Sequence, residues 1–319
     1  MKKLSKKFML SIVAIALVVI ALGTSTFAWF TLSNKASVGQ FNAEVTAGEG
    51  MELSVDGTTW YSNIPSTVIQ AKIASNFTAL NLNADKPILT AVTTNDENLG
   101  LFKKIKKDQT GFEEATANAD YIKIQIYVRA VGIDKVSIDT LEVTGTAADW
   151  TSDADTFTGA NNTSVTEGLL VSVSAASGAR IGIRSANATD STFVYENAAV
   201  TTGTTNAVLG GAGVATPTTT LPTIGQAAYF ELKNGFNPNV ATPTFTNVPT
   251  SVIGSVTSVD PAVEVLTLTD ANNGFYAETF DLFVWFEGFD ADTYDSILKM
   301  PLNIKMSFEG TPVTPVVTP

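Results

Sequence analysis

The chain has 319 residues, of which 45% are hydrophobic, a formal charge of −12, and neither cysteine nor histidine. The lack of both residue types excludes disulfides, thiolate and Ser-His-Asp nucleophiles, and the usual zinc and copper sites. The acidic balance disfavours binding to nucleic acid or anionic lipid, and the hydrophobic content is sufficient for a sizeable core.

Residues 1–28 have the pattern of a secretory signal peptide. Four lysines precede an apolar run from Phe8 to about Gly23, and Thr26 and Ala28 stand at the −3 and −1 positions of a cleavage site. An uncleaved membrane anchor is the alternative, but the run is shorter than the ~20 residues that a spanning helix needs. We therefore expect a protein that is secreted or lies at the cell surface and meets the membrane only through this peptide.

Cleavage after Ala28 leaves an apolar arm at the new N-terminus. Trp29, Phe30 and Leu32 are followed by the polar Ser33-Asn34-Lys35. Burying each large apolar side chain contributes about 1.5–3 kcal/mol, so the arm is expected to find a groove, either in its own subunit or in another copy. An extended arm can add as a strand to an open sheet edge.

Alternating apolar and polar residues then predict a first group of strands. We expect strands at 41–47, 51–55 and 87–92, with a two-residue hairpin turn at Asp56-Gly57 leading into Thr59-Trp60-Tyr61. Between Ser62 and Leu82 the apolar spacing is closer to helical, which predicts one short helix with Ser66 as its N-cap.

Four lysines gather in the next segment, 102–114. Lys103, Lys104, Lys106 and Lys107 could form a polyanion-binding patch. In so acidic a chain we favour a solvated hairpin edge, because lysine on an edge strand discourages unwanted pairing.

The remaining strands complete an all-β pattern. Strands are expected at 122–129, 136–143, 169–173, 179–183, 263–268, 280–286 and 302–308, with Arg180 and Arg184 pointing outward and 169–173 pairing with 179–183 across Ser177-Gly178. Loop composition covers 145–164, a long surface insertion covers 197–249, and a Pro/Thr-rich tail covers 311–319. About ten strands with at most minor helix predict a two-sheet antiparallel sandwich, in one domain spanning 29–310.

Several segments resemble the TasA and camelysin group of exported bacterial proteins. They are TFAWFTLSN (26–34), FNAEVTAGEGMELS (41–54) and PLNIKMSFEG (301–310). FVWFEGFD (283–290) and the stretch Tyr121 to Arg129 resemble recurrent motifs in related secreted proteins with no assigned function. The resemblance implies a jelly-roll sandwich on the cell surface or in the biofilm matrix. It also implies that the N-terminal segment of one subunit completes a sheet of the next, so that copies of the chain form a fibre. The insertion at 197–249 departs from the family pattern.

Two other function classes remain open. Without histidine the His-Glu-x-x-His metalloprotease motif is excluded. Paired carboxylates could still catalyse glycoside hydrolysis, and Glu287 and Asp290 are the acidic pair nearest to an aromatic residue, although an acidic turn is the commoner origin of such a pair. We therefore predict no enzyme. A sandwich that binds cell-wall or matrix polysaccharide would use Trp60, Tyr61, Trp150 or Trp285, although such aromatics more often pack within a fold.

No cofactor is expected, with calcium as the one alternative. Asp290, Asp292 and Asp295 place three carboxylates within one turn, which suits a hard cation, but the turn lacks the glycine and distal glutamate of an EF-hand. A solvated acidic turn is the other interpretation.

The strand around Trp285 is apolar on both faces. Phe280, Leu282, Val284 and Phe286 take one face, which leaves Phe283 and Trp285 on the face that should meet water. Either the insertion at 197–249 covers this second face, or another subunit does.

Overall fold

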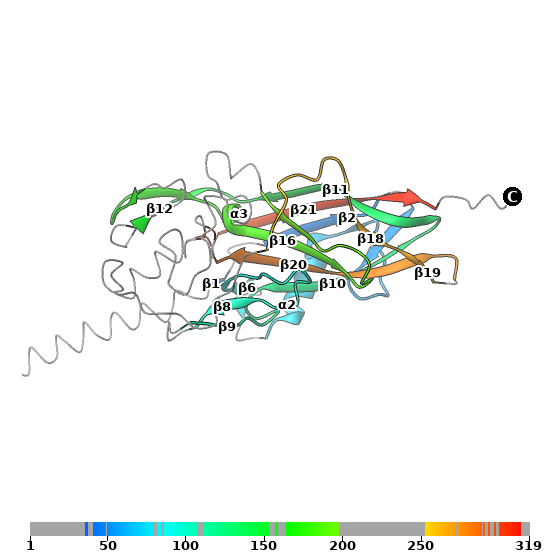
Figure 1. Cartoon of the computed structure of the whole chain (residues 1–319), viewed down its shortest axis with the longest axis horizontal. Coiled ribbons are helices and arrows are strands. Elements are labelled where there is room, and N and C mark those ends of the chain that lie inside the picture. The colour runs from blue at the N-terminus through cyan, green and yellow to red at the C-terminus, as the bar shows by residue number, and fades with distance from the viewer. Residues whose placement is uncertain are drawn as a thin grey trace, which may run out of the picture. The chain divides into compact units, whose positions relative to one another are not determined.

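Two β-sheets form the body of the protein, and the chain passes repeatedly from one sheet to the other (Figure 1). The structure is a computed structural model. It describes residues 36–37, 41–48, 50–78, 82–83, 86–106, 111–152, 157–158, 164–197, 253–271, 273–288, 290, 293, 297 and 300–313. All of these belong to one compact unit, Lys35–Pro319. The predicted signal peptide, the assembly arm and most of the predicted insertion and tail lie outside the described residues.

The five-stranded sheet has the order β18-β11-β21-β2-β4. Its strands are β18 (Val263–Thr267), β11 (Ile133–Thr144), β21 (Leu302–Pro312), β2 (Phe41–Thr46) and β4 (Asn63–Ile64). Figure 1 shows β11, β21 and β2 running side by side. The alternation predicted at 302–308 is confirmed, since Leu302, Ile304, Met306 and Phe308 are all buried.

The seven-stranded sheet has the order β17-β16-β20-β10-β3, with β19 and β7 also paired to β20. Its strands are β17 (Phe193–Glu196), β16 (Ala179–Ser185), β20 (Tyr276–Glu287), β10 (Ile122–Ala130), β3 (Met51–Ser54), β19 (Thr269–Asp270) and β7 (Ala91–Val92). In the long β10–β20 pair Ile124 lies opposite Leu282, which aligns the buried residues of both strands.

Short elements surround the two sheets. They are β1 (Ala36–Ser37), β5 (Leu82–Asn83), β6 (Lys86–Leu89), β8 (Lys103–Ile105), β9 (Phe112–Glu114), β12 (Ala148–Thr151), β13 (Phe157–Thr158), β14 (Ser164–Val165), β15 (Leu170–Val173), α2 (Ser66–Asn76) and α3 (Ala175–Gly178). The prediction of a mostly β, sandwich-like fold with very little helix is thus confirmed. No helix within the described ranges is both long and apolar enough to cross a membrane.

Pairing within the sheets is not wholly antiparallel, contrary to the prediction. β2 runs parallel to β21, with Ala43 opposite Ile304, and β7 runs parallel to β20. Parallel neighbours need a long connection between them. For β2 and β21 the whole body of the chain supplies that connection, because they are the first and last strands of the two main sheets.

The predicted helix is present, but its cap is one residue earlier than expected. Pro65 is the N-cap, with extended backbone angles, and Ser66 is the first helical residue. Ile69 and Ile73 are the buried residues of α2 and belong to the main core. The helical spacing thus predicts the presence of α2 correctly, but it places the N-cap one residue too late.

Strand β11 changes phase in its middle. Ile138 lies opposite Phe308 and Thr140 opposite Ser307, which leaves Asp139 as an extra residue in a β-bulge. The bulge explains why the buried residues shift from Val136 and Ile138 to Leu141 and Val143.

One predicted hairpin is wrong, and another is present with a longer loop than predicted. β15 pairs with β12, not with β16, because α3 separates the two predicted partners. The segment 145–164, expected to be loop, contains β12 and β13. Near Asp56 the chain does turn, but Leu53 bridges to Tyr61, so the loop between them is longer than two residues.

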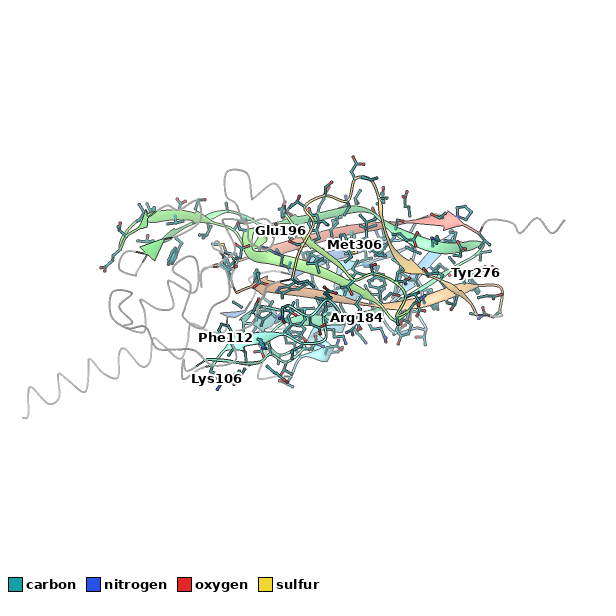
Figure 2. All side chains as sticks on the ribbon, viewed as in Figure 1. Lys106, Phe112, Arg184, Glu196, Tyr276 and Met306 are labelled. Atoms are coloured by element: carbon teal, nitrogen blue, oxygen red, sulfur yellow. The ribbon has the colours of Figure 1, made fainter. Side chains whose placement is uncertain are left out.

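The two inner faces share one hydrophobic core, to which both sheets and α2 contribute. Met306, labelled in Figure 2, is fully buried in it. At the C-terminus β21 continues through Thr311 and Pro312, two residues into the segment predicted as tail, because these residues pair with Lys135 and Ile133 of β11.

Candidate functional site

The assembly arm predicted at Trp29, Phe30 and Leu32 lies outside the described residues, but the strand that follows it is described. β1 pairs antiparallel with β6, with Ala36 opposite Leu89 and Ser37 opposite Ile88. The chain therefore already takes part in edge pairing a few residues after the arm.

The continuation of this pairing toward the arm is occupied. In the same register the residues before Ala36 would face 90–93, and Thr90 N–H already donates to the Asp120 carbonyl. β7 pairs with β20 on one edge, and Thr93 exchanges two 2.8 Å hydrogen bonds with Lys103. The arm thus has no in-register place on this strand of its own subunit.

The second face of β20 is buried by a segment that the sequence did not indicate. Phe283 and Trp285 lie in an outer aromatic cluster, which consists of Val92, Leu99, Phe102, Tyr121, Val194, Phe283 and Trp285. The Phe102 ring lies 4.2 Å from the Tyr121 ring and 5.2 Å from the Trp285 ring. The described cover comes mainly from 92–121, and the contribution of the predicted insertion stays a prediction because 198–252 lies outside the described residues.

Burial in this cluster changes the acidity of Tyr121. Desolvation raises the pKa of Tyr121 to about 12 from 10.0, the charge of Asp120 and Asp281 adds to the rise, and Arg184 opposes it. The phenol is therefore held in its neutral form.

Arg180 is the centre of a buried charge cluster, which consists of Arg180, Glu196, Glu287 and Asp290. Arg180 lies on the outer face of β16, as predicted, but this face is covered, and only 4% of the residue is exposed. Its Nη2 lies 2.6 Å from Glu196 Oε2 and 2.5 Å from Asp290 Oδ2.

The second outward arginine, Arg184, is part-exposed, and its Nη2 lies 2.6 Å from Asp281 Oδ2. Figure 2 shows Glu196 and Arg184 at opposite ends of the β16–β17 pair.

The buried charge cluster holds three carboxylates and one guanidinium. Burial opposes the charge of Arg180, but Asp290, Glu196 and Glu287 outweigh it and raise the pKa of the guanidinium. Glu287 also accepts a 3.2 Å hydrogen bond from Trp285 Nε1. The cluster thus ties together β16, β17 and the end of β20.

This arrangement leaves the acidic pair Glu287 and Asp290 without access to a substrate. Their exposed fractions are 1% and 0%, and Asp290 is bound by Arg180. General acid catalysis requires contact with the substrate, so this pair has the geometry of a structural element.

The calcium hypothesis stays a prediction. Asp290 is paired with Arg180, and Asp292 and Asp295 lie outside the described residues. Among the residues that the structure describes, no group of three or more Asp or Glu side chains is arranged to hold a metal ion.

The aromatic residues considered for sugar binding have separate locations. Trp285 is in the outer aromatic cluster, Trp150 lies on β12, and Tyr61 bridges Leu53. The Trp60 ring lies 4.1 Å from the Arg129 guanidinium. Trp285 is only 1% exposed and therefore offers no ring face to a sugar, and sugar binding by the other three aromatics stays a prediction.

The predicted lysine-bearing hairpin is confirmed as the β8–β9 pair. Lys104 Nζ lies 2.7 Å from Asp120 and 3.7 Å from Glu113, while Lys107 lies outside the described residues. Carboxylates of the same region therefore compensate Lys104, which argues against a polyanion patch centred on it.

A hollow on the outer face of the five-stranded sheet was missed in the sequence. Its volume is about 280 Å³. It is lined by Asn42, Ala43, Glu44, Ser66, Glu142, Thr144, Asn303, Ile304 and Lys305. The signal in the sequence was the polar set of outward positions on three strands that are far apart along the chain.

No protein-family model, curated protein or solved structure matches the chain.

Proposed function

We propose that the chain is an exported structural subunit of an extracellular fibre or biofilm matrix. The N-terminal arm of one copy, with Trp29, Phe30 and Leu32, adds as a strand to a sheet of the next copy. Head-to-tail addition of this kind repeats without closing and produces a fibre.

The observation that carries this proposal is the pairing of β1. The chain joins an edge strand at Ala36 and Ser37, and the positions that would pair with the preceding residues are taken by Asp120, β20 and Lys103. An apolar arm without a place on this strand is costly in water, and an open edge of a second copy would bury its side chains and pair its backbone groups.

The strand order supports a jelly roll as the finer description of the fold. Apart from β17, which pairs with β16 in the same sheet, and the short β7 and β19, the strands alternate between the two sheets in the order β2, β3, β4, β10, β11, β16, β18, β20 and β21. Such alternation between two packed sheets is characteristic of jelly rolls.

The test compares the chain from Trp29 to Pro319 with a form that lacks Trp29 to Lys35. We expect the intact form to polymerise in sedimentation and negative-stain microscopy, and the deleted form to stay monomeric with the same circular dichroism. A third form, with Trp29, Phe30 and Leu32 all replaced by serine, separates the apolar side chains from the length of the arm.

Two outcomes contradict the proposal. One is an intact chain that stays monomeric at high concentration, and the other is a deleted form that assembles as the intact form does.

A further inference from the structure

We propose that the hollow on the outer face of the five-stranded sheet binds one neutral sugar unit of a saccharide. This inference goes beyond assembly and does not depend on it. It rests on the register of three strands, on the hydrogen bonds that fix the side chains, and on the charge of the hollow.

The register places the outward side chains of β2, β21 and β11 in rows. Asn42, Asn303 and Thr144 form one row, because Asn303 lies opposite both of the others. Glu44, Lys305 and Glu142 form the next row, with Lys305 in the middle. Neighbouring strands are ~4.8 Å apart, so each row offers polar groups at the spacing of substituents on opposite sides of a sugar ring.

The first row is held in place by its own hydrogen bonds. Asn42 Nδ2 donates to Asn303 Oδ1 at 2.8 Å, and Gln70 Nε2 of α2 donates to Asn42 Oδ1 at 2.8 Å. This leaves the Asn303 Nδ2 group as a donor toward the hollow. Side chains that are already oriented lose less entropy when a ligand binds.

The second row has hydrogen-bonding groups that are available to a ligand. Asn63 Nδ2 donates to Glu44 Oε1 at 2.7 Å, which leaves Glu44 Oε2 as an acceptor. Lys305 and Glu142 are exposed, and within the described part of the chain neither forms an ion pair or a side-chain hydrogen bond. The hollow thus presents an ammonium donor between carboxylate acceptors, beside the Asn303 donor.

This set of groups selects the ligand class. Two carboxylates against one ammonium disfavour an anion, and the polar lining disfavours an apolar ligand. Neighbouring hydroxyls of a sugar each donate and accept, so they match alternating acceptors and donors. A volume of about 280 Å³ lies just below the range for drug-sized ligands, so the hollow takes a single unit of a longer chain.

The test measures binding of cellotetraose, chitotetraose and laminaritetraose to the chain from Trp29 to Pro319, by calorimetry and saturation-transfer NMR. We expect at least one of the three to bind with a Kd of about 1 mM or below. Glu142→Gln and Lys305→Gln should each weaken that binding about tenfold or more, since each removes a charged hydrogen-bonding group.

Glu309→Gln is the matched control. Glu309 is an exposed residue on the same face of β21, outside the hollow, and its substitution should leave binding unchanged. Unchanged unfolding midpoints show that the variants keep the fold. The inference is overturned if none of the three saccharides binds up to about 10 mM, or if Glu309→Gln weakens binding as much as Glu142→Gln does. Neither result bears on fibre assembly.

Discussion

The two sheets share one core but differ on their outer faces. On the five-stranded sheet the outward residues Asn42, Glu44 and Lys305 are polar and meet solvent. On the seven-stranded sheet the outward residues Phe283 and Trp285 are each only 1% exposed. The outer face of the five-stranded sheet is thus open to solvent, whereas the outer face of the seven-stranded sheet is buried under 92–121.

The two outer faces differ in what they contribute: the covered face contributes to stability, and the open face is available for recognition. The covered face adds a second hydrophobic cluster and a buried charge cluster, so substitutions there should be costly. The open face carries side chains that touch little beyond their neighbours in the sheet, so substitutions there should be tolerated and should affect ligands instead. We therefore expect substitutions on the covered face to lower stability more than substitutions on the open face.

The largest effect is expected at Arg180. Arg180→Met leaves Glu196, Glu287 and Asp290 buried without their cation, which should lower the free energy of unfolding by about 3–5 kcal/mol in chemical denaturation. Arg184→Met on the same strand is the control, and its part-exposed pair with Asp281 should cost about 1 kcal/mol or less.

Neutralising the partners tests the cause of that loss. The triple variant Arg180→Met, Glu196→Gln, Asp290→Asn should recover part of the stability, because fewer uncompensated charges stay buried. Equal losses for Arg180→Met and Arg184→Met would show that the face at Arg180 is open to solvent.

Gly182 tests how tightly the outer aromatic cluster packs on β16. A Cβ there would lie 2.5 Å from Leu99 Cδ1 and 3.1 Å from Trp285 Cζ3. Gly182→Ala should therefore destabilise the protein by about 1–3 kcal/mol, measured by thermal or chemical unfolding. Gly254→Ala is the control, because a Cβ at Gly254 meets nothing within 4 Å. If Gly182→Ala leaves the free energy of unfolding unchanged, Leu99 does not pack tightly against β16.

Tyr121 gives the covered face a dependence on alkaline pH. Its pKa is raised from 10.0 to about 12 in the folded protein, so its contribution to stability is complete below the unfolded pKa and is lost as the pH rises through that interval. We expect the melting temperature to fall less steeply between about pH 10 and about pH 12 in Tyr121→Phe than in the wild type. Tyr195, whose pKa is also raised by burial, should keep part of the fall in both proteins. If the melting temperatures of the wild type and Tyr121→Phe depend on pH in the same way, Tyr121 does not cause the alkaline loss of stability.

The smallest effect is expected on the open face. Lys305→Met replaces an exposed side chain without an ion pair in the described structure, so the free energy of unfolding should change by no more than about 0.5 kcal/mol. A loss above about 1 kcal/mol would show that the face is structural and would remove the contrast with Arg180.

Much of this fold could be predicted from the sequence alone. Where one face of a strand is buried and the other faces solvent, apolar and polar residues alternate along the strand. This alternation identifies β10, β2 and β21. Helical spacing likewise identified α2 and its buried Ile69 and Ile73. The mostly β, two-sheet organisation follows from these local patterns because each is set by the burial of neighbouring residues in the chain.

Which strands pair with one another does not follow from the local patterns. Alternation does not name the partner of a strand, so β15 was assigned to β16 instead of β12, and the parallel pairing of β2 with β21 was not foreseen. The cover on Trp285, the burial of Arg180 and the hollow that joins Asn42, Glu142 and Asn303 all bring together residues distant along the chain. Periodicity records which face of a segment is apolar, but contacts between distant segments depend on how whole sheets pack.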